Sequence, residues 1–345
     1  MGAEMVEIDP VRPATRLLDD LGARLRAGAL VAFPTETVYG LGASIDRPDA
    51  LRRIFEAKSR PSTDPLIVHV AGIDALEGVV DGVDDRALRL ADACWPGPLT
   101  MVLPRGPLVD DLVTAGGPSV AVRVPAHPVA IGLVRAAGVG IAAPSANRFG
   151  RISPTTADDV RDELEERLID GDTILAGGPT PLGIESTVVD LTTHRPTVLR
   201  HGGLPWEDLV AVLGHVDAPE RRVVGDGVLA ASPGSLIRHY SPDTPLVLVE
   251  GDEQMADALI RELADRGVVA RLVGLPSGPE AAARELYRTL RAADRSGVSL
   301  LLAVVVDPAG MGRGVNDRLY RAAHGRVVAE CVAGSVDRLE MLARA

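Results

Sequence analysis

Short apolar runs, each followed by a segment rich in glycine, proline, serine or threonine, constrain this chain more than any other feature of its sequence. Amphipathic helices alternate with these runs, beginning with a helix over residues 14–27 whose leucines share one face. Such alternation of buried strands and helices predicts an α/β fold. In the first part of the chain we expect strands at 29–33, 66–70, 100–103, 120–124, 140–143, 173–176, 186–190 and 197–200, and further helices at 48–57, 84–94, 128–137 and 156–168.

The pattern is interrupted after residue 214 by a stretch with several glycines and prolines and little periodicity, which reads as a long connection. A second alternation then predicts a small Rossmann-like parallel α/β domain. Its strands are expected at 246–249, 268–273 and 298–306, and its helices at 253–265, 280–293 and 315–323. We therefore expect a first domain over residues 1–214, a linker over 215–244 and a second domain over 245–345.

Composition narrows the functional classes. The net charge of −12 argues against a general binder of nucleic acid or acidic membranes, although a local basic cleft is compatible with it. The apolar runs are too short to cross a bilayer and the acidic N-terminus lacks the apolar core of a signal peptide, so we expect a cytoplasmic protein. Cys94 and Cys331 fit no metal-ligand or disulfide pattern, and we interpret both as buried small hydrophobes.

Four polar segments carry the candidate chemistry. The first, PTETVYGLG over residues 34–42, follows a buried strand. Its glycines allow a ligand close to the backbone, and its hydroxyls are neutral hydrogen-bonding groups. The spacing is not that of a Walker A loop, and a tight turn without a ligand is the alternative.

The second segment, KSRPSTDPLIVH over residues 58–69, places two cations between a helix and a strand. Arg60 offers bidentate geometry and Lys58 a point charge, which suits a phosphate chain; a solvated surface pair is the alternative. Lys58 is the only lysine among 36 basic residues, which hints at a position that requires a compact ammonium. His69 ends the strand, where a histidine is more often a satisfied core group than a catalyst.

The third segment, SVAVRVP over residues 119–125, contains Arg123 within an apolar strand. A buried arginine requires a partner, either a protein carboxylate or the carboxylate of an amino-acid substrate. The fourth segment, AAPSANRFGRISPT over residues 142–155, begins at the end of a buried strand, where α/β proteins place ligands. Its Ser145 and Ser153 are candidates for binding a nucleotide phosphate, and an ordered loop is the alternative.

These segments, followed by GIESTVVD over residues 183–190 and by the pair Leu199–Arg200, closely resemble the YrdC-like threonylcarbamoyl-adenylate synthase family and occur in its order. The stretch SPGSLIRHYSP over residues 232–242 and the added domain resemble the longer, two-domain form of that family. The last domain matches chiefly at GRGVNDRLYRAA over residues 312–323. The resemblance implies a YrdC-like twisted-sheet domain with a concave cleft, followed by the small parallel domain.

The resemblance also implies a reaction. Members of the family join ATP, bicarbonate and L-threonine into threonylcarbamoyl-AMP and release pyrophosphate, the first step of a modification of tRNA that decodes codons beginning with A. In-line attack on a phosphate mainly needs positioning and charge neutralisation, so we expect no covalent enzyme intermediate. Lys58 and Arg60 would be the catalytic cations, and Mg²⁺ would be bound mainly by the ATP phosphates and water. A separate threonylcarbamoyl transferase complex would receive the product.

Residue roles follow from the same resemblance. L-Threonine would be contacted by Thr37, His69, Arg123, Ala143 and Ser186. ATP would be contacted by Lys58, Arg60, Asp64, Ser119, Ser145, Asn147, Ser153 and Arg200, with Tyr240 of the linker closing over the nucleotide. Two positions depart from the family, which usually has asparagine at Asp64 and proline at His201. A carboxylate near ATP phosphates is unfavourable unless it faces magnesium or a cation.

Two other functions remain open on the sequence. A carbamoyl-transfer module, as in hydrogenase-maturation proteins, shares the YrdC-like fold but accompanies acylphosphatase and zinc-finger regions, neither of which is visible in this sequence. An RNA-binding module without catalysis could use the same cations, and weak RNA binding is compatible with them. The acidic total and the lack of a basic tract argue against RNA as the main ligand.

Overall fold

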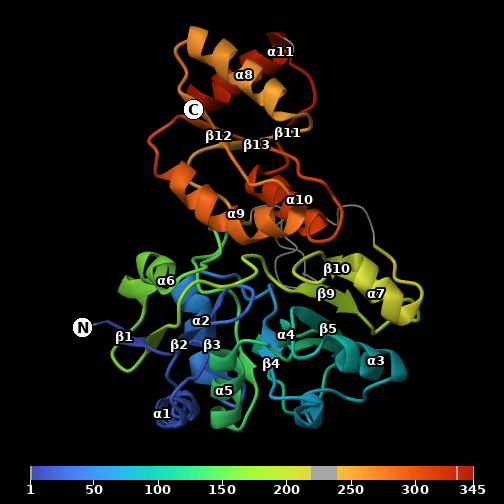
Figure 1. Ribbon diagram of the computed structural model, residues 1–345. Coiled ribbons are helices and arrows are strands. Elements are labelled where there is room, and N and C mark those ends of the chain that lie inside the picture. Colours follow the sequence, from blue (N-terminus) through green and yellow to red (C-terminus); the bar gives the residue numbers. More distant parts are fainter. Residues whose placement is uncertain (1, 219–238, 332, 345) are drawn as a thin grey trace. The chain divides into compact units, whose positions relative to one another are not determined.

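The computed structural model describes residues 2–218, 239–331 and 333–344 (Figure 1). Its contacts divide the chain into two units. Unit 1 comprises residues 1–149 and 153–235, and unit 2 comprises residues 150–152 and 236–345. Most of the predicted linker, residues 219–238, lies outside the described residues, so its role in closing a site stays a prediction.

Unit 1 is built on a mixed ten-stranded sheet with the order β1-β8-β2-β3-β7-β4-β6-β5-β9-β10. β4 and β6 run parallel near its middle, and β7 is antiparallel to β4. The strands are β1 (Glu4–Glu7), β2 (Val31–Pro34), β3 (Tyr39–Ser44), β4 (Ile67–His69), β5 (Leu99–Pro104), β6 (Ser119–Arg123), β7 (Ile141–Ala142), β8 (Thr173–Ala176), β9 (Thr187–Asp190) and β10 (Thr197–Arg200).

Helices cover both faces of this sheet. Along β2, Val31 and Phe33 belong to one hydrophobic core while Leu30 and Ala32 belong to another, as the two-residue period of a strand requires. Burial on both faces explains why the strands read as continuous apolar runs. The first core is closed by α1 (Thr15–Arg26) and α5 (Pro128–Ala137), which pack together (Figure 1). The other helices are α2 (Pro48–Lys58), α3 (Asp85–Cys94), α4 (Asp111–Thr114), α6 (Ala157–Leu164) and α7 (Trp206–Leu213), with 3₁₀ turns at Ile73–Leu76 and Glu165–Arg167.

Unit 2 contains the predicted parallel sheet, with the order β12-β13-β11-β14. Its strands are β11 (Leu246–Val249), β12 (Ala270–Val273), β13 (Leu300–Val304) and β14 (Val327–Val328), and its helices are α8 (Glu253–Asp265), α9 (Pro279–Asp294), α10 (Gly312–Ala322) and α11 (Ala333–Arg344). The segment 150–152 belongs here because Ser241 N donates to Gly150 O at 2.8 Å and Arg291 Nη2 donates to Ile152 O at 2.6 Å. In the part of the chain that the structure describes, no helix is long and apolar enough to cross a membrane.

The sequence patterns predicted most elements but missed several. The second half of PTETVYGLG forms the start of β3 and is not only a turn. At Gly42 of β3 a Cβ atom would lie 2.7 Å from Ile141 Cγ2 of β7, so the close approach of these two strands favours glycine there. β1, α4, α7, α11 and β14 were also missed. Both cysteines are free, but Cys331 is exposed and Cys94 only half-buried, so their interpretation as buried hydrophobes was wrong for Cys331.

Candidate active site

Pairing of β4 with β6 brings two of the predicted residues together. His69 and Arg123 are Cα partners across this parallel pair, and on its other side His69 is paired with Ile141 of β7. Side chains of directly paired residues lie on the same face of a sheet. The imidazole and the guanidinium therefore share one face, at the carboxyl ends of two parallel strands.

Arg123 is 3 % exposed and uses three of its five N–H groups on the protein. Nη2 lies 2.6 Å from Glu36 Oε1, Nη1 donates to Thr37 Oγ1 at 3.0 Å, and Nε donates to Gly97 O at 3.2 Å. The buried arginine thus has the protein carboxylate that we considered as one alternative. We call Glu36, Thr37 and Arg123 the Arg123 pocket.

The hydrogen bonds of the β2–β3 turn fix the direction of the Thr37 hydroxyl. Thr35 Oγ1 donates to Val38 O at 2.7 Å, because a carbonyl can only accept. Thr37 Oγ1, 2.8 Å from Thr35 Oγ1, is therefore the donor of this pair, and Thr35 Oγ1 also accepts from the backbone N–H groups of Thr37 at 3.1 Å and Val38 at 3.2 Å. With its proton committed and one bond accepted from Arg123, Thr37 Oγ1 retains the capacity to accept one more hydrogen bond.

Two histidines beside the Arg123 pocket are held neutral. Burial, together with the nearby charge of Arg123, lowers the pKa of His69 to about 3. Burial also lowers the pKa of His127, although the charge of Glu36 opposes the shift. Neither imidazole therefore adds charge to the ion pair between Glu36 and Arg123 at neutral pH.

Lys58 is 1 % exposed and does not form the solvated surface pair that was the alternative. The helix α2 carries it on the buried face and ends at Ser59, which has a left-handed φ of 51°. Its Nζ donates to Ser145 O at 2.6 Å and also to Asn147 O. Burial, and then the charge of Arg60, hold the pKa of Lys58 well below its usual value. We call Lys58, Ser145 and Asn147 the Lys58 clamp, because the ammonium holds the backbone of the fourth polar segment.

Arg60 faces the unusual carboxylate of Asp64. Their side chains are 3.0 Å apart and almost completely buried, and the guanidinium also donates to Asp64 O at 3.1 Å and Pro65 O at 2.7 Å. A carboxylate near ATP phosphates is tolerable when it faces a cation, and Arg60 is that cation for Asp64. Asn147, also buried, donates from Nδ2 to Arg148 O at 2.8 Å.

A third group of side chains lies where the segment before β9 meets β10. Arg200 Nη2 donates to Ser186 O at 3.0 Å and to Ser186 Oγ at 3.1 Å, and Ser186 Oγ lies 2.7 Å from Thr100 Oγ1. The close approach depends on Gly202, where a Cβ atom would lie 2.3 Å from Glu185 O. A predicted ATP contact, Arg200, therefore directly holds a predicted threonine contact, Ser186.

The predicted nucleotide loop lies beside the first polar segment. Ala143 N donates to Ile67 O at 2.9 Å, and Ser145 forms a β-bridge with Gly40 of β3. Ser153 is buried and donates to Glu185 Oε1 at 2.5 Å. These bonds bring the segments containing Thr37, Lys58, Ala143 and Ser145 into one neighbourhood of unit 1.

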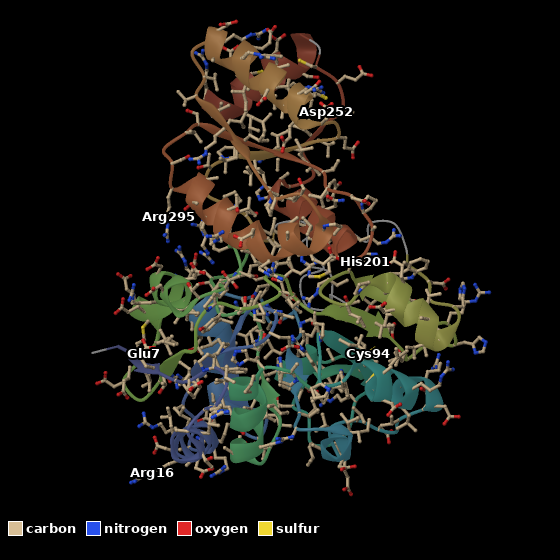
Figure 2. The ribbon with its side chains drawn as sticks, in the orientation of Figure 1. Glu7, Arg16, Cys94, His201, Asp252 and Arg295 are labelled. Atoms are coloured by element: carbon tan, nitrogen blue, oxygen red, sulfur yellow. The ribbon has the colours of Figure 1, made fainter. Side chains whose placement is uncertain are left out.

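Two predicted residues are not members of these groups. Ser119 opens β6, at the opposite end of the strand from Arg123. Tyr240 belongs to unit 2, where its ring stacks on Tyr287 at a centroid distance of 5.8 Å and lies 5.3 Å from the guanidinium of Arg318. Figure 2 shows the side chains on the ribbon and labels His201, which directly follows β10 and stands where the family usually has proline.

Two protein-family models match this chain along most of its length. The model described as "Telomere recombination", for Sua5, YciO and YrdC proteins, matches residues 23–202, and "Threonylcarbamoyl-AMP synthase, C-terminal domain" matches residues 205–324. The threonylcarbamoyl-AMP synthase of Pyrococcus abyssi is 40% identical over 320 residues, covering 88% of this chain and 93% of the relative. The chain belongs to the threonylcarbamoyl-AMP synthase family.

A second curated relative and two solved structures are also similar to this chain. The Bacillus subtilis enzyme is 40% identical over 329 residues, covering 89% of this chain and 92% of the relative. A crystal structure of P. abyssi Sua5 complexed with L-threonine matches with a TM-score of 0.89 and 38% identity, covering 95% of this chain and 99% of that chain. Escherichia coli YciO matches with a TM-score of 0.51 and 26% identity, covering 58% of this chain and 96% of that chain.

Three residues that support the predicted site were not expected from the sequence. Glu36 pairs with Arg123, Glu185 accepts from Ser153, and Thr100 adjoins Ser186. The signal for Glu36 was available in part, because Arg123 required a partner and PTETVYGLG contains a carboxylate. Glu185 and Thr100 carry no comparable signal, since their role depends on contacts between distant segments.

Proposed function

We propose that this chain synthesises threonylcarbamoyl-AMP from ATP, bicarbonate and L-threonine, with release of pyrophosphate and water. The observation that carries the proposal is the Arg123 pocket, where a buried guanidinium has two N–H groups left beside a hydroxyl and a neutral imidazole. These hydrogen-bonding groups suit a small hydroxylated amino acid. Membership of the family, and the L-threonine bound in a relative at 38% identity, support this choice of substrate.

The reaction forms two bonds in sequence. The amine nitrogen of threonine bonds to the carbon of bicarbonate, water is lost, and a carbamate results. A carbamate oxygen then bonds to the α-phosphorus of ATP while the bond to the departing pyrophosphate breaks. Thr37, His69, Arg123, Ala143 and Ser186 would hold threonine for the first step, and no side chain needs to form a covalent bond to the substrate.

The second step requires positioning and charge neutralisation around the phosphates. Arg60 and Arg200 would supply charge directly, and the Lys58 clamp would set the shape of the loop that carries Ser145 and Asn147. Asp64, Ser119 and Ser153 would complete the nucleotide contacts. Magnesium would enter as part of the Mg–ATP substrate. Among the described residues no group of three or more His, Cys, Asp or Glu side chains is arranged to hold a metal ion.

The reaction is a nucleotidyl transfer, because an adenylyl group passes from pyrophosphate to a carbamate. The mixed anhydride formed is an activated carrier and needs an acceptor. The acceptor would be tRNA, and a separate threonylcarbamoyl transferase complex in the cytoplasm would catalyse the transfer. This chain itself would bind RNA only weakly. The linker and Tyr240 would close over the nucleotide and protect the labile carbamate from water.

The test is pyrophosphate release from Mg–ATP, measured with and without L-threonine and bicarbonate. Release that requires both supports the proposal. Release indifferent to threonine would favour a carbamoyl-transfer reaction, and no release together with salt-sensitive RNA binding would favour the RNA-binding alternative.

A further inference from the structure

One oxygen of a buried carboxylate in the Arg123 pocket is unused. Glu36 Oε1 is paired with Arg123, but Glu36 Oε2 is inaccessible to solvent and has no hydrogen-bond partner among the residues that the structure describes. A buried acceptor without a partner destabilises the folded protein, and more so when the group is charged. Such an atom points to a ligand that supplies a donor.

The neighbouring groups define what that ligand must carry. Arg123 retains two N–H donors that have no acceptor in the described part of the chain, and Thr37 Oγ1 can accept one further bond. His69 Nδ1 is likewise buried and unpartnered within the described residues. Donors on a guanidinium beside an acceptor on a carboxylate match a molecule that has both a carboxylate and an ammonium group.

We propose that Glu36 is a substrate-binding residue that accepts a hydrogen bond on Oε2 from the α-ammonium group of L-threonine, while Arg123 binds the α-carboxylate. This inference rests on the proposed function, since it assigns a role within the same threonine site. Glu36 appears in none of the site residues that the sequence resemblance implied.

Charge balance gives Glu36 a role in specificity. Arg123 alone would attract any small carboxylate, including hydroxy acids that have no amine to capture bicarbonate. Glu36 makes the ion pair neutral, so a simple anion gains little from entering and a zwitterion gains two complementary contacts. The two nearby histidines do not alter this balance, because burial keeps both neutral.

The test pairs two ligands with two proteins. Binding of L-threonine and of (R)-3-hydroxybutyrate, which is threonine without its amino group, is measured by calorimetry on the full chain and on Glu36→Gln. We expect Glu36→Gln to weaken threonine binding about 30-fold or more, and to leave 3-hydroxybutyrate binding unchanged or tighter. The exposed Glu77→Gln is the matched control and should change neither.

Each other outcome overturns the inference. Equal weakening of both ligands would mean that Glu36 only orients Arg123, since both ligands carry the carboxylate. Unchanged threonine binding would exclude the contact. If Glu36→Gln does not fold, Glu36→Asp is measured instead; it retains the charge and should weaken the binding of threonine but not of 3-hydroxybutyrate. The native chain also provides a test, because binding 3-hydroxybutyrate as tightly as threonine would contradict the inference. Failure of the proposed function is seen separately, as pyrophosphate release that does not require threonine.

Discussion

Two of the buried basic residues of unit 1, Lys58 and Arg123, are held in different ways. Lys58 directs its ammonium to the backbone carbonyls of Ser145 and Asn147, within the loop after β7. Arg123 directs its guanidinium mainly to side chains, Glu36 and Thr37, and keeps two N–H groups in reserve.

The difference separates two tasks that a cation can perform in one site. A compact ammonium between two carbonyls fixes the shape of a loop, and a planar guanidinium with remaining donors can recognise a ligand. We therefore expect changes in the Lys58 clamp to affect folding and the use of ATP, and changes in the Arg123 pocket to affect mainly the use of threonine.

Lys58→Met should have the largest effect, because two buried carbonyl groups would lose a charged donor. We expect the free energy of unfolding to fall by about 2–4 kcal/mol and kcat/KM for ATP to fall about 100-fold or more. Urea denaturation and pyrophosphate release measure the two effects. Lys58→Arg is the matched variant and should also be impaired, since a branched guanidinium does not fit between the two carbonyls; full activity of either variant would contradict the clamp.

Arg123→Lys keeps the charge that pairs with Glu36 but removes the planar set of donors. We expect kcat/KM for threonine to fall about 30- to 100-fold, equivalent to about 2–3 kcal/mol, with the KM for ATP changed by less than about threefold. Steady-state pyrophosphate release with each substrate varied gives both constants. Equal losses for the two substrates would remove the distinction between the two cations.

His69→Asn tests the neutral imidazole beside Arg123. The pKa of His69 is lower in the folded protein than in the unfolded chain, so the unfolded state binds more protons and stability falls as the pH falls below about 6.5. The native protein should lose about 2 kcal/mol from this residue between pH 7 and pH 5, and His69→Asn should lack that loss. Denaturation at both pH values checks it. The exposed His194→Asn should behave like the native protein.

Thr35→Val should have the smallest effect. The change keeps the shape of the side chain but removes the oxygen that accepts from the Thr37 hydroxyl and from the backbone N–H groups of Thr37 and Val38. The Thr37 hydroxyl can then turn its proton toward the ligand instead of accepting a bond from it. We expect kcat/KM for threonine to fall about fivefold, or about 1 kcal/mol. The matched Thr35→Ser retains the hydroxyl and should remain close to native activity; a fivefold loss in both variants would point to packing instead of hydrogen bonding.

The fold was predictable where burial leaves a plain pattern. Strands such as β2 and β11 are apolar throughout because helices cover both faces of their sheets. β3 was missed because its glycines at 40 and 42 carry no apolar signal, although neighbouring side chains fill the space around them. α7 was missed because only Leu209 of this helix is fully buried, so that its periodicity is weak.

The site was predictable as a set of motifs but not as a set of contacts. That Arg123 needs a partner follows from its apolar strand, but Glu36 lies 87 residues away and nothing in the spacing selects it. The partners of Lys58 are backbone carbonyls, which every residue possesses and no sequence pattern reveals. Side-chain chemistry can therefore be anticipated from residue types, whereas the groups that orient it depend on the folded chain.

The assignment of residues 150–152 to unit 2 has a consequence for any attempt to cut this protein into parts. The chain leaves unit 1 after Phe149, returns at Ser153 and leaves again, so no single cleavage point yields two complete pieces. A fragment ending at residue 214 would carry Arg151 without Asp243 and Ile152 without Arg291. Inactivity of such a fragment would report a broken loop as readily as a missing partner domain.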